Sequence, residues 1–350
     1  MTDTIVVEAP ARLHFGLLDL RGGMGRRFGG VGAPAPGVSV RVAVSPATEV
    51  VALGDEWERA ADFARRFLAY HRISGGARVV VERSIPAHAG LGSGTQLGLS
   101  TAKALAELYR VAATPVELAR AVGRAKRSAV GTWTFAGGGF VVEGGRRIGA
   151  DDDVGPLLAR QPFPSSWRCV LAVPDAPPGV SGAMEALAFA DLPLPDERDV
   201  ERVSHLVLMG MLPSVIDGDL ETFGAALSEV QEINGRWFSH AQGGMFAPGP
   251  SAEIIRLMCD SGAPGVGQSS WGPSVYAIVD GDDAAESLST HIRDRCAHRV
   301  AVYAGPFPST GSIVFKRLFK GSDPLKSRLH MGGDVQSYCP PRGHNVPVRG

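Results

Sequence analysis

Short runs of β-branched residues in the first quarter of the chain predict a sheet. The runs cover residues 4–8, 38–44, 50–53 and 77–83, and several of them alternate apolar with polar positions. Between the last two runs, residues 56–72 carry apolar side chains at helical spacing with charges on the opposite side. This pattern predicts a helix that covers one face of the sheet.

Later segments alternate between helical and strand patterns. A helix is expected over 96–110, and another begins at Thr114, Pro115 and Glu117, which form a capping box with proline at the first helical position. The second half predicts strands at 168–173, 274–279 and 299–303, and helices at 182–190, 198–212, 219–233 and 251–261. Because no strict βαβ period appears, we expect an α+β architecture with antiparallel sheets packed by helices, not a doubly wound nucleotide fold.

The length of 350 residues allows two domains that share a cleft. We place an N-terminal domain at 1–160 and a C-terminal domain at 161–320. Residues 321–350 are rich in Gly, Pro, Ser and charge, with few apolar residues, and are predicted to form a disordered tail.

Composition excludes several classes of function. Hydrophobic residues make up 44%, charged residues 20%, and the formal net charge is −1, so a soluble protein with no nucleic-acid partner is expected. The cysteines Cys169, Cys259, Cys296 and Cys339 stand singly, which is typical of reduced thiols in a cytoplasm. The N-terminus has no secretion-signal pattern, and no apolar run is long enough to span a membrane.

The sharpest local signal is a glycine loop, residues 86–96, between the strand at 77–83 and the next helix. Backbone N–H groups at a helix N-terminus favour phosphate, and Gly90, Gly92 and Gly94 let the backbone approach a ligand closely, while Ser93 and Thr95 add hydroxyl donors. The loop lacks the GK[ST] of a Walker motif and the context of a Rossmann GxGxxG. The alternative is a strand-to-helix turn that packs tightly and binds nothing.

Pro86, Gly90, Leu91, Gly92 and Ser93 resemble the PxxxGLGSS phosphate loop of the galactokinase, homoserine kinase and mevalonate kinase (GHMP) superfamily. This resemblance implies a two-domain fold with a ribosomal-protein-S5-like first domain and a ferredoxin-like second domain. The chain departs from the kinases at Gly94, Thr95 and Gln96, where a hydroxyl near the metal is lost. Simple phosphotransfer from ATP is therefore in doubt.

Further segments resemble one branch of that superfamily, the β-ribofuranosylaminobenzene 5′-phosphate synthases. The similar segments are residues 9–20, 29–40, 137–145, 177–189, 242–246 and 267–278. The resemblance implies an enzyme that condenses 4-aminobenzoate or 4-hydroxybenzoate with phosphoribosyl pyrophosphate and releases CO₂ and pyrophosphate, in tetrahydromethanopterin biosynthesis. It also implies a homodimer, and it leaves the choice between the two benzoates open.

That reaction needs a site for the departing pyrophosphate. Residues 90–96, namely Gly90, Leu91, Gly92, Ser93, Gly94, Thr95 and Gln96, are candidates for this role together with Mg²⁺, whose ligands the sequence does not assign. Arg26 and Arg27 are candidates for a second phosphate, with two solvated loop arginines as the alternative. The sequence carries no motif for an organic cofactor.

The first strand supplies the candidate catalytic residues. Strand alternation places Arg12 and His14 on one face, and we expect either of them to bind the substrate carboxylate or a phosphate. Asp19 is a candidate for supporting the ribosyl cation or a metal. The alternative for His14 is a hydrogen-bonded structural histidine.

An aromatic-binding segment is predicted at Gln268, Ser269, Ser270 and Trp271. The indole offers a face on which a benzoate ring can stack, and the neighbouring side chains offer polar groups. The alternative is a tryptophan that fills the core of the second domain. Gly182 and Glu185 are weaker candidates because helix capping favours the same residues.

Two other functions remain possible on this fold. An ATP-dependent small-molecule kinase would keep the loop but would turn over ATP without releasing CO₂. A catalytically silent binding protein would bind ligand without turnover, since a fold does not fix a function.

Overall fold

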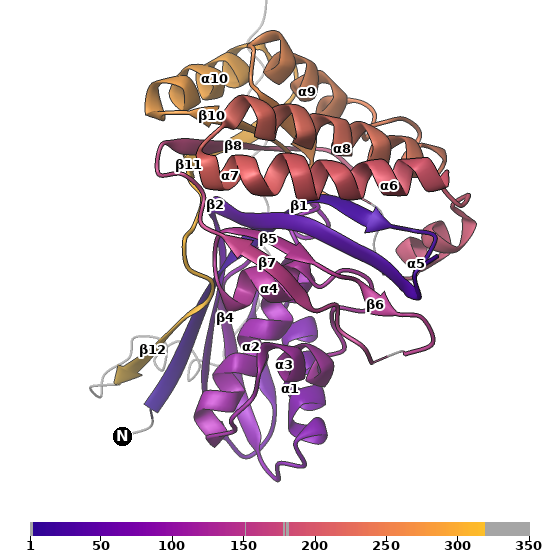
Figure 1. The fold of residues 1–350 in the computed structure, drawn as a ribbon. Coiled ribbons are helices and arrows are strands. Elements are labelled where there is room, and N and C mark those ends of the chain that lie inside the picture. The colour runs from indigo at the N-terminus through magenta and orange to yellow at the C-terminus, as the bar shows by residue number, and fades with distance from the viewer. Residues whose placement is uncertain (1–2, 151, 178, 180–181, 319–350) are drawn as a thin grey trace, which may run out of the picture.

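A computed structural model describes residues 3–150, 152–177, 179 and 182–318 (Figure 1). The elements are, in chain order, β1 (Asp3–Asp19), β2 (Arg26–Ala47), β3 (Val51–Gly54), α1 (Trp57–Tyr70), β4 (Gly76–Arg83), α2 (Ser93–Tyr109), α3 (Pro115–Ala121), α4 (Val130–Ala136), β5 (Phe140–Glu143), β6 (Arg146–Arg147), β7 (Leu157–Gln161), β8 (Trp167–Pro174), α5 (Gly182–Asp191), α6 (Glu197–His205), the π-helical segment η1 (Leu206–Met211), α7 (Leu212–Asp217), α8 (Leu220–Gln242), α9 (Pro250–Asp260), β9 (Gly265–Gln268), β10 (Val275–Asp280), α10 (Asp282–Arg295), β11 (Val300–Pro306) and β12 (Ile313–Leu318).

The strands form two sheets. The larger has eight strands with the order β12-β1-β2-β4-β3, to which β5, β6 and β7 are added, and the smaller has the order β11-β8-β10-β9. All pairings are antiparallel except that of β3 with β4. The predicted α+β class with antiparallel sheets is therefore confirmed.

The long strand β1 is interrupted by two register shifts against β2, between Pro10 and Arg12 and between His14 and Gly16. Such shifts bend a strand and re-aim its side chains. Arg12 and His14 lie in the regular stretch between the two shifts, opposite Pro34 and Gly32. Strand alternation therefore keeps these two side chains on one face, as the sequence predicted.

The smaller sheet is covered on both faces, and alternate residues of β8 belong to different cores. Leu171 is part of the main core, which also contains Phe223 of α8. Val170 is part of a second core that contains Ile254 of α9 and Ile292 of α10. Because successive strand residues point to opposite faces, the sheet separates α8 from α9 and α10. Figure 1 shows α9 and α10 at one end of the molecule and α1 to α3 at the other.

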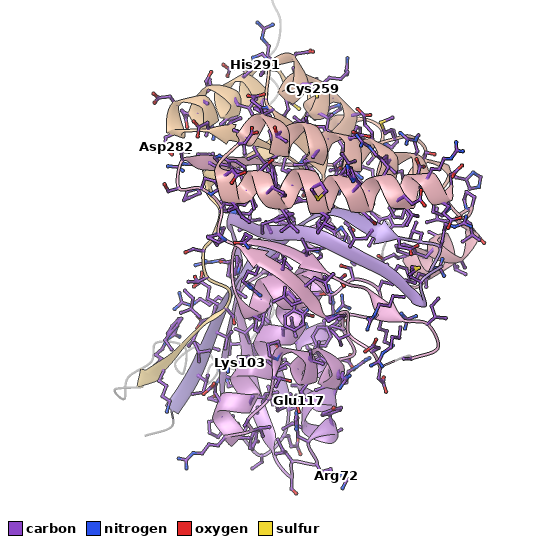
Figure 2. All side chains as sticks on the ribbon, viewed as in Figure 1. Arg72, Lys103, Glu117, Cys259, Asp282 and His291 are labelled. Atoms are coloured by element: carbon purple, nitrogen blue, oxygen red, sulfur yellow. The ribbon has the colours of Figure 1, made fainter. Side chains whose placement is uncertain are left out.

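The last described strand, β12, pairs with β1 in the larger sheet. The range 161–320 predicted for the second domain therefore contains a strand that completes the sheet of the first. The predicted disordered tail at 321–350 and Cys339 lie outside the described residues. The other three cysteines are free. Figure 2 shows the two ends of the molecule, with Cys259 on α9 at one end and Lys103 on α2 and Glu117 on α3 toward the other.

Most helices begin close to where their patterns predicted. The capping box is confirmed, since the Thr114 hydroxyl accepts from the Glu117 N–H while the Glu117 carboxylate accepts from the Thr114 N–H. The predicted helix at 198–212 is instead divided into α6, η1 and the start of α7. In the described part of the chain, no helix is both long and apolar enough to cross a bilayer.

Candidate active site

A cavity of about 540 Å³ lies where the two halves of the molecule meet. Its walls come from β1, the glycine loop and the start of α2, the segment 123–128, and α5, α8 and the loop after β9. One side of this cavity is lined by arginines and the other by aromatic side chains. This volume is within the range of small-molecule sites.

The glycine loop forms the first wall. Gly90 and Gly92 have φ values of 76° and 71°, which L side chains rarely adopt. A Cβ atom on Gly90 would collide with the carbonyl oxygen of Ser269, and one on Gly92 would come within 2.7 Å of the Arg12 side chain. The loop therefore favours glycine at both positions because of their positive φ values and the close approach of the Ser269 carbonyl oxygen and the Arg12 side chain.

The loop leads directly into α2. The N–H groups of Thr95 and Gln96 both bond to the Gly92 carbonyl oxygen at 3.0 Å. The amides of Ser93 and Gly94 precede these bonds at the open, electropositive end of a helix of 17 residues. This end of α2 faces the cavity and suits an anion.

Cationic side chains surround the same end of α2. The Arg124 guanidinium donates to the Thr95 hydroxyl from Nε at 3.2 Å and from Nη2 at 3.1 Å. Burial, and then the neighbouring charge of Arg59, lower the pKa of Arg124 to about 10. It is still charged at neutral pH, and a cation held in a site with few counter-charges favours a bound anion.

Gly94 leaves room for one of these cations. A Cβ atom on Gly94 would collide with Nη2 of Arg59, whose Nη1 pairs with Glu56 at 2.6 Å. The Arg59 guanidinium, at the end of a flexible side chain, therefore lies directly against the backbone of Gly94 and would have to shift for a longer residue at this position.

Arg12 and His14 form the floor between the loop and the aromatic side. Arg12 Nη1 donates to the Gly90 carbonyl oxygen at 2.5 Å, and burial lowers the pKa of Arg12 to about 10. Burial, and then the charge of Arg12, lower the pKa of His14 well below its usual value. The imidazole is therefore neutral near pH 7 and can accept or donate one proton.

The aromatic side is a cage of Phe189, Phe238 and Trp271. Trp271 lies edge to face with Phe238 at 4.8 Å and with Phe189 at 5.5 Å between ring centroids, and the two phenylalanines are 5.7 Å apart. All three line the cavity. The three rings pack against one another, and the side of this cage that faces the cavity can take a planar aromatic ring in offset or edge contact.

Glu185 connects the cage with the cations. Its Oε1 accepts from Trp271 Nε1 at 3.2 Å, and its Oε2 pairs with Arg127 Nη2 at 2.6 Å. The Arg127 guanidinium carbon also lies 4.9 Å from the centroid of the Phe189 ring. Glu185 therefore fixes both the indole and a guanidinium at the boundary between the two sides.

The structure brings most of the predicted residues to this cavity. The predicted residues that line it are Arg12, His14, Gly90, Leu91, Gly92, Ser93, Gly94, Thr95, Glu185, Gln268, Ser270 and Trp271. Two others support the wall from behind. Gln96 is fully buried and donates to the Gly131 carbonyl oxygen, and the Ser269 hydroxyl accepts from the His14 N–H and donates to the Gly90 carbonyl oxygen.

Like Gln96 and Ser269, the predicted residues Asp19, Arg26 and Arg27 are not part of the cavity lining. Asp19 Oδ1 accepts from the N–H groups of Arg21 and Gly22 at 2.6 and 2.8 Å, which makes it a turn-forming residue at the end of β1. Arg26 donates to the Gly145 carbonyl oxygen and Arg27 to the Leu20 carbonyl oxygen, each at 2.8 Å. Their proposed contacts with substrate stay predictions.

Sequence reasoning missed several residues of the site. Arg124 and Arg127 belong to the run GRAKRS at 123–128, whose three cations next to a short helix were the available signal. Phe189 and Phe238 carried no signal, because a single phenylalanine in an amphipathic helix usually belongs to the core. Only the folded chain brings α5 and α8 to the glycine loop.

Known proteins share this arrangement at the level of fold. Residues 57–139 match the family model of the GHMP kinases N terminal domain. The homoserine kinase of Cytophaga hutchinsonii superposes with a TM-score of 0.67 at 17% identity, covering 90% of this chain and 98% of that one. A mevalonate diphosphate decarboxylase of Staphylococcus aureus gives 0.63 at 14% identity, covering 90% and 98%. The fold and the glycine loop thus define a protein of the GHMP kinase fold.

Closer relatives carry a different name. The β-ribofuranosylphenol 5′-phosphate synthase of Methanothermobacter thermautotrophicus is 36% identical over 301 residues, 80% of this chain and 90% of that protein. The protein of that name in Archaeoglobus fulgidus is 34% identical over 306 residues, 84% and 93% of the two chains. This chain belongs to the β-ribofuranosylphenol 5′-phosphate synthase family. The family resemblance seen in the sequence is confirmed.

Proposed function

We propose that this protein is a transferase that condenses 4-hydroxybenzoate or 4-aminobenzoate with phosphoribosyl pyrophosphate to give a C-riboside, CO₂ and pyrophosphate. The observation that carries the proposal is a single cavity with an anion-binding wall at α2 and an aromatic cage opposite it. The two substrates have these complementary chemistries. Family membership supports the same reaction, and its place is tetrahydromethanopterin biosynthesis.

The relatives are named for a phenol product, which favours 4-hydroxybenzoate as the aromatic substrate. An aminobenzoate has nearly the same size and also donates electrons to the ring. Both benzoates are therefore candidate substrates.

The cationic wall would hold the leaving group. The amides of Ser93 and Gly94 and the guanidinium of Arg124 take the diphosphate, so that charge developing on the departing oxygen meets preorganised donors. Burial makes these interactions stronger than they would be in water. Arg127, whose guanidinium lies against the Phe189 ring, and Arg12, which also lines the cavity, would pair with the benzoate carboxylate.

The cage would hold the ring over C1 of the ribose. Stacking orients the ring carbon that carries the carboxylate, and orientation of two bound reactants removes much of the entropic barrier. Asp19 stays a candidate for supporting the ribosyl cation, and Arg26 and Arg27 stay candidates for the 5′-phosphate. An Asp19→Asn variant that turns over as fast as the wild type would remove Asp19 from the account.

Mg²⁺ fits this site as an ion that enters with the diphosphate. Among the residues that the structure describes, no group of three His, Cys, Asp or Glu side chains is placed to hold a metal. The carboxylates that line the cavity, Glu56 and Glu185, are paired with Arg59 and Arg127. Mg²⁺ commonly keeps water and phosphate oxygens as ligands, and when bound it would neutralise charge on the diphosphate.

The kinase alternative keeps the loop but is less well supported. Residue 94 is a glycine packed against Arg59, where a kinase is expected to carry a hydroxyl side chain. The closer relatives are named as synthases. Incubation with Mg²⁺, phosphoribosyl pyrophosphate and carboxyl-labelled benzoate, beside a mixture with ATP alone, separates the possibilities. Labelled CO₂ supports the synthase, ADP supports a kinase, and binding without either product supports a silent protein.

We also propose a cytoplasmic homodimer that acts on small molecules, without an organic cofactor, nucleic acid or membrane as partner. The resemblance to the family supports the dimer, and the near-neutral charge argues against nucleic acid. Light scattering at micromolar concentration tests the dimer, and a monomer mass would contradict it.

A further inference from the structure

A buried carboxyl group lies behind the cavity wall, at the end of β5. The side chain of Glu143 has 0% exposure. Its Oε1 accepts from the Ala129 N–H at 3.0 Å and its Oε2 from the Gly145 N–H at 2.8 Å. Burial raises the pKa of Glu143 to about 7, and these hydrogen bonds oppose the rise. The group can therefore take up and release a proton near neutral pH.

Ser128 connects this carboxyl with the cavity. It lines the cavity and directly precedes Ala129, whose N–H donates to the Glu143 carboxylate, and its side chain lies close enough to that carboxyl to lower the pKa of Glu143. The Ser128 hydroxyl oxygen also accepts from the Val130 N–H at 3.2 Å. Its Oγ also lies 3.0 Å from Nε2 of His14. A carboxyl, a hydroxyl and an imidazole thus follow one another from a buried strand to the cavity, and the hydroxyl and the imidazole are in hydrogen-bond contact.

The proposed reaction has a use for such a path. A phenol attacks through its para carbon far more readily once its O–H proton has left, because the oxygen electron pair then flows into the ring. That carbon bonds to C1 of the ribose as the C1–O bond breaks and its electron pair leaves with pyrophosphate. Loss of CO₂ returns the C–C electron pair to the ring and restores a phenolate, which must regain a proton. In each turnover the substrate therefore gives up one proton and the product takes one up.

We infer that Glu143, acting through Ser128 and His14, stores the proton that the aromatic substrate gives up during attack and returns it to the product. This inference rests on the proposed function. The substrate proton passes to Nδ1 of His14, the Nε2 proton passes to Ser128 Oγ, and the Ser128 hydroxyl proton passes to the Glu143 carboxylate. The reverse transfers protonate the product, so no proton is consumed. His14 is the catalytic residue of this path, and Ser128 and Glu143 are relay residues.

The features of the three groups suit this role. The neutral imidazole offers one donor and one acceptor nitrogen, which a relay needs. A carboxyl group whose pKa lies near the working pH is the most effective at both accepting and releasing a proton. The carboxyl also sits where bulk water does not compete for the proton, because the strand is fully buried.

Fluorinated substrates test the relay in the full-length protein. Fluorine ortho to the hydroxyl makes the phenol more acidic with little change in size, so 3-fluoro- and 3,5-difluoro-4-hydroxybenzoate need less help to ionise. We expect the ratio of wild-type to Glu143→Gln kcat to be about 100 with 4-hydroxybenzoate, a typical contribution of acid–base catalysis. The ratio should fall toward about 1 with the difluoro substrate at pH 8.

Controls separate the relay from a structural role of Glu143. Thr132→Val removes a buried hydroxyl from α4 and should give the same kcat ratio with every substrate. If Glu143→Gln does not fold, Ser128→Ala replaces it in the same series. A loss that is equal for all three substrates overturns the relay but leaves the synthase intact. No CO₂ from the three hydroxybenzoates with the wild type overturns the relay, and if 4-aminobenzoate also gives none, the synthase proposal is overturned with it.

Discussion

The Arg124 guanidinium donates two hydrogen bonds to the Thr95 hydroxyl in the first turn of α2. This contact places a half-buried cation beside the open amides of a helix N-terminus. The partial positive charge at the N-terminus of α2 and the charge of the Arg124 guanidinium therefore attract the same bound anion. Two positive groups so close together suit a diphosphate, which carries more than one negative charge.

Replacing Arg124 should weaken binding of phosphoribosyl pyrophosphate. A hydrogen bond to a charged group contributes about 1.5–3 kcal/mol, so Arg124→Gln should raise the KM for this substrate roughly 10- to 100-fold. The KM for the benzoate should change little. Arg66→Gln is the matched control, since Arg66 pairs with Asp62 on the exposed side of α1. Equal effects of the two variants would mean that long-range charge, and not contact, is responsible.

Shortening Trp271 should weaken binding of the aromatic substrate. The indole contacts both phenylalanines of the cage, and aromatic pairs contribute about 0.5–1.5 kcal/mol beyond burial. Trp271→Leu should therefore raise the Kd for 4-hydroxybenzoate about tenfold or more, measured by calorimetry, and leave pyrophosphate binding unchanged. Trp57→Leu, at a half-exposed site on α1, should change neither. An unchanged benzoate Kd for Trp271→Leu would place the ring elsewhere.

Gly90→Ala should damage both stability and activity. The positive φ alone costs an alanine about 1 kcal/mol, and the new methyl group also collides with the Ser269 carbonyl oxygen. Gly218→Ala separates the two effects, because Gly218 has a φ of 77° with open space around it. Thermal unfolding should show a larger loss for Gly90→Ala than for Gly218→Ala. Similar losses would mean that the loop moves aside easily.

The raised pKa of Glu143 predicts a pH dependence of stability. Between about pH 4.5 and 7 the native carboxyl keeps a proton that the unfolded chain has released, so its contribution to stability falls as pH rises through this range. A pKa change from 4.5 to about 7 corresponds to roughly 3 kcal/mol. The difference in unfolding free energy between wild type and Glu143→Gln should shrink by roughly this amount from pH 4.5 to 7, measured by urea denaturation.

The contribution of Glu117 to stability should have the opposite pH dependence, and this residue serves as the control. Hydrogen bonds from Thr114 lower the pKa of its carboxyl, so its contribution is present above the ordinary value and is lost as pH falls below it. The difference between wild type and Glu117→Gln should therefore decrease toward acid. A difference for Glu143→Gln that follows the Glu117→Gln curve would contradict a raised pKa at Glu143.

Local sequence patterns predicted the elements that depend on local physics. The glycine loop and the Thr114 capping box involve residues a few positions apart, so their chemistry can be read directly. α10 was missed because its sequence, DDAAESLSTHIRDR, carries few apolar residues and depends on contact with the smaller sheet. α8 continues to Gln242, beyond the predicted end at 233.

The rest of the site depends on tertiary contacts that no local pattern contains. Arg124 meets Thr95 across 29 positions of sequence, and Trp271 meets Glu185 across 86. Asp19 resembled a catalytic carboxylate, but its nearest donors are backbone amides of the following turn. Glu143 follows three apolar residues at a strand end, where a glutamate normally faces solvent, and only the fold shows that it is buried.

The most direct test of the central claim is the stoichiometry of one reaction. Purified protein is incubated with Mg²⁺, phosphoribosyl pyrophosphate and carboxyl-labelled 4-hydroxybenzoate, with 4-aminobenzoate in parallel. CO₂, pyrophosphate and the C-riboside are then quantified together. The account predicts equal amounts of all three, dependent on phosphoribosyl pyrophosphate and strongly reduced in Arg124→Gln. Pyrophosphate without CO₂, or no CO₂ and no pyrophosphate with either benzoate, would contradict it.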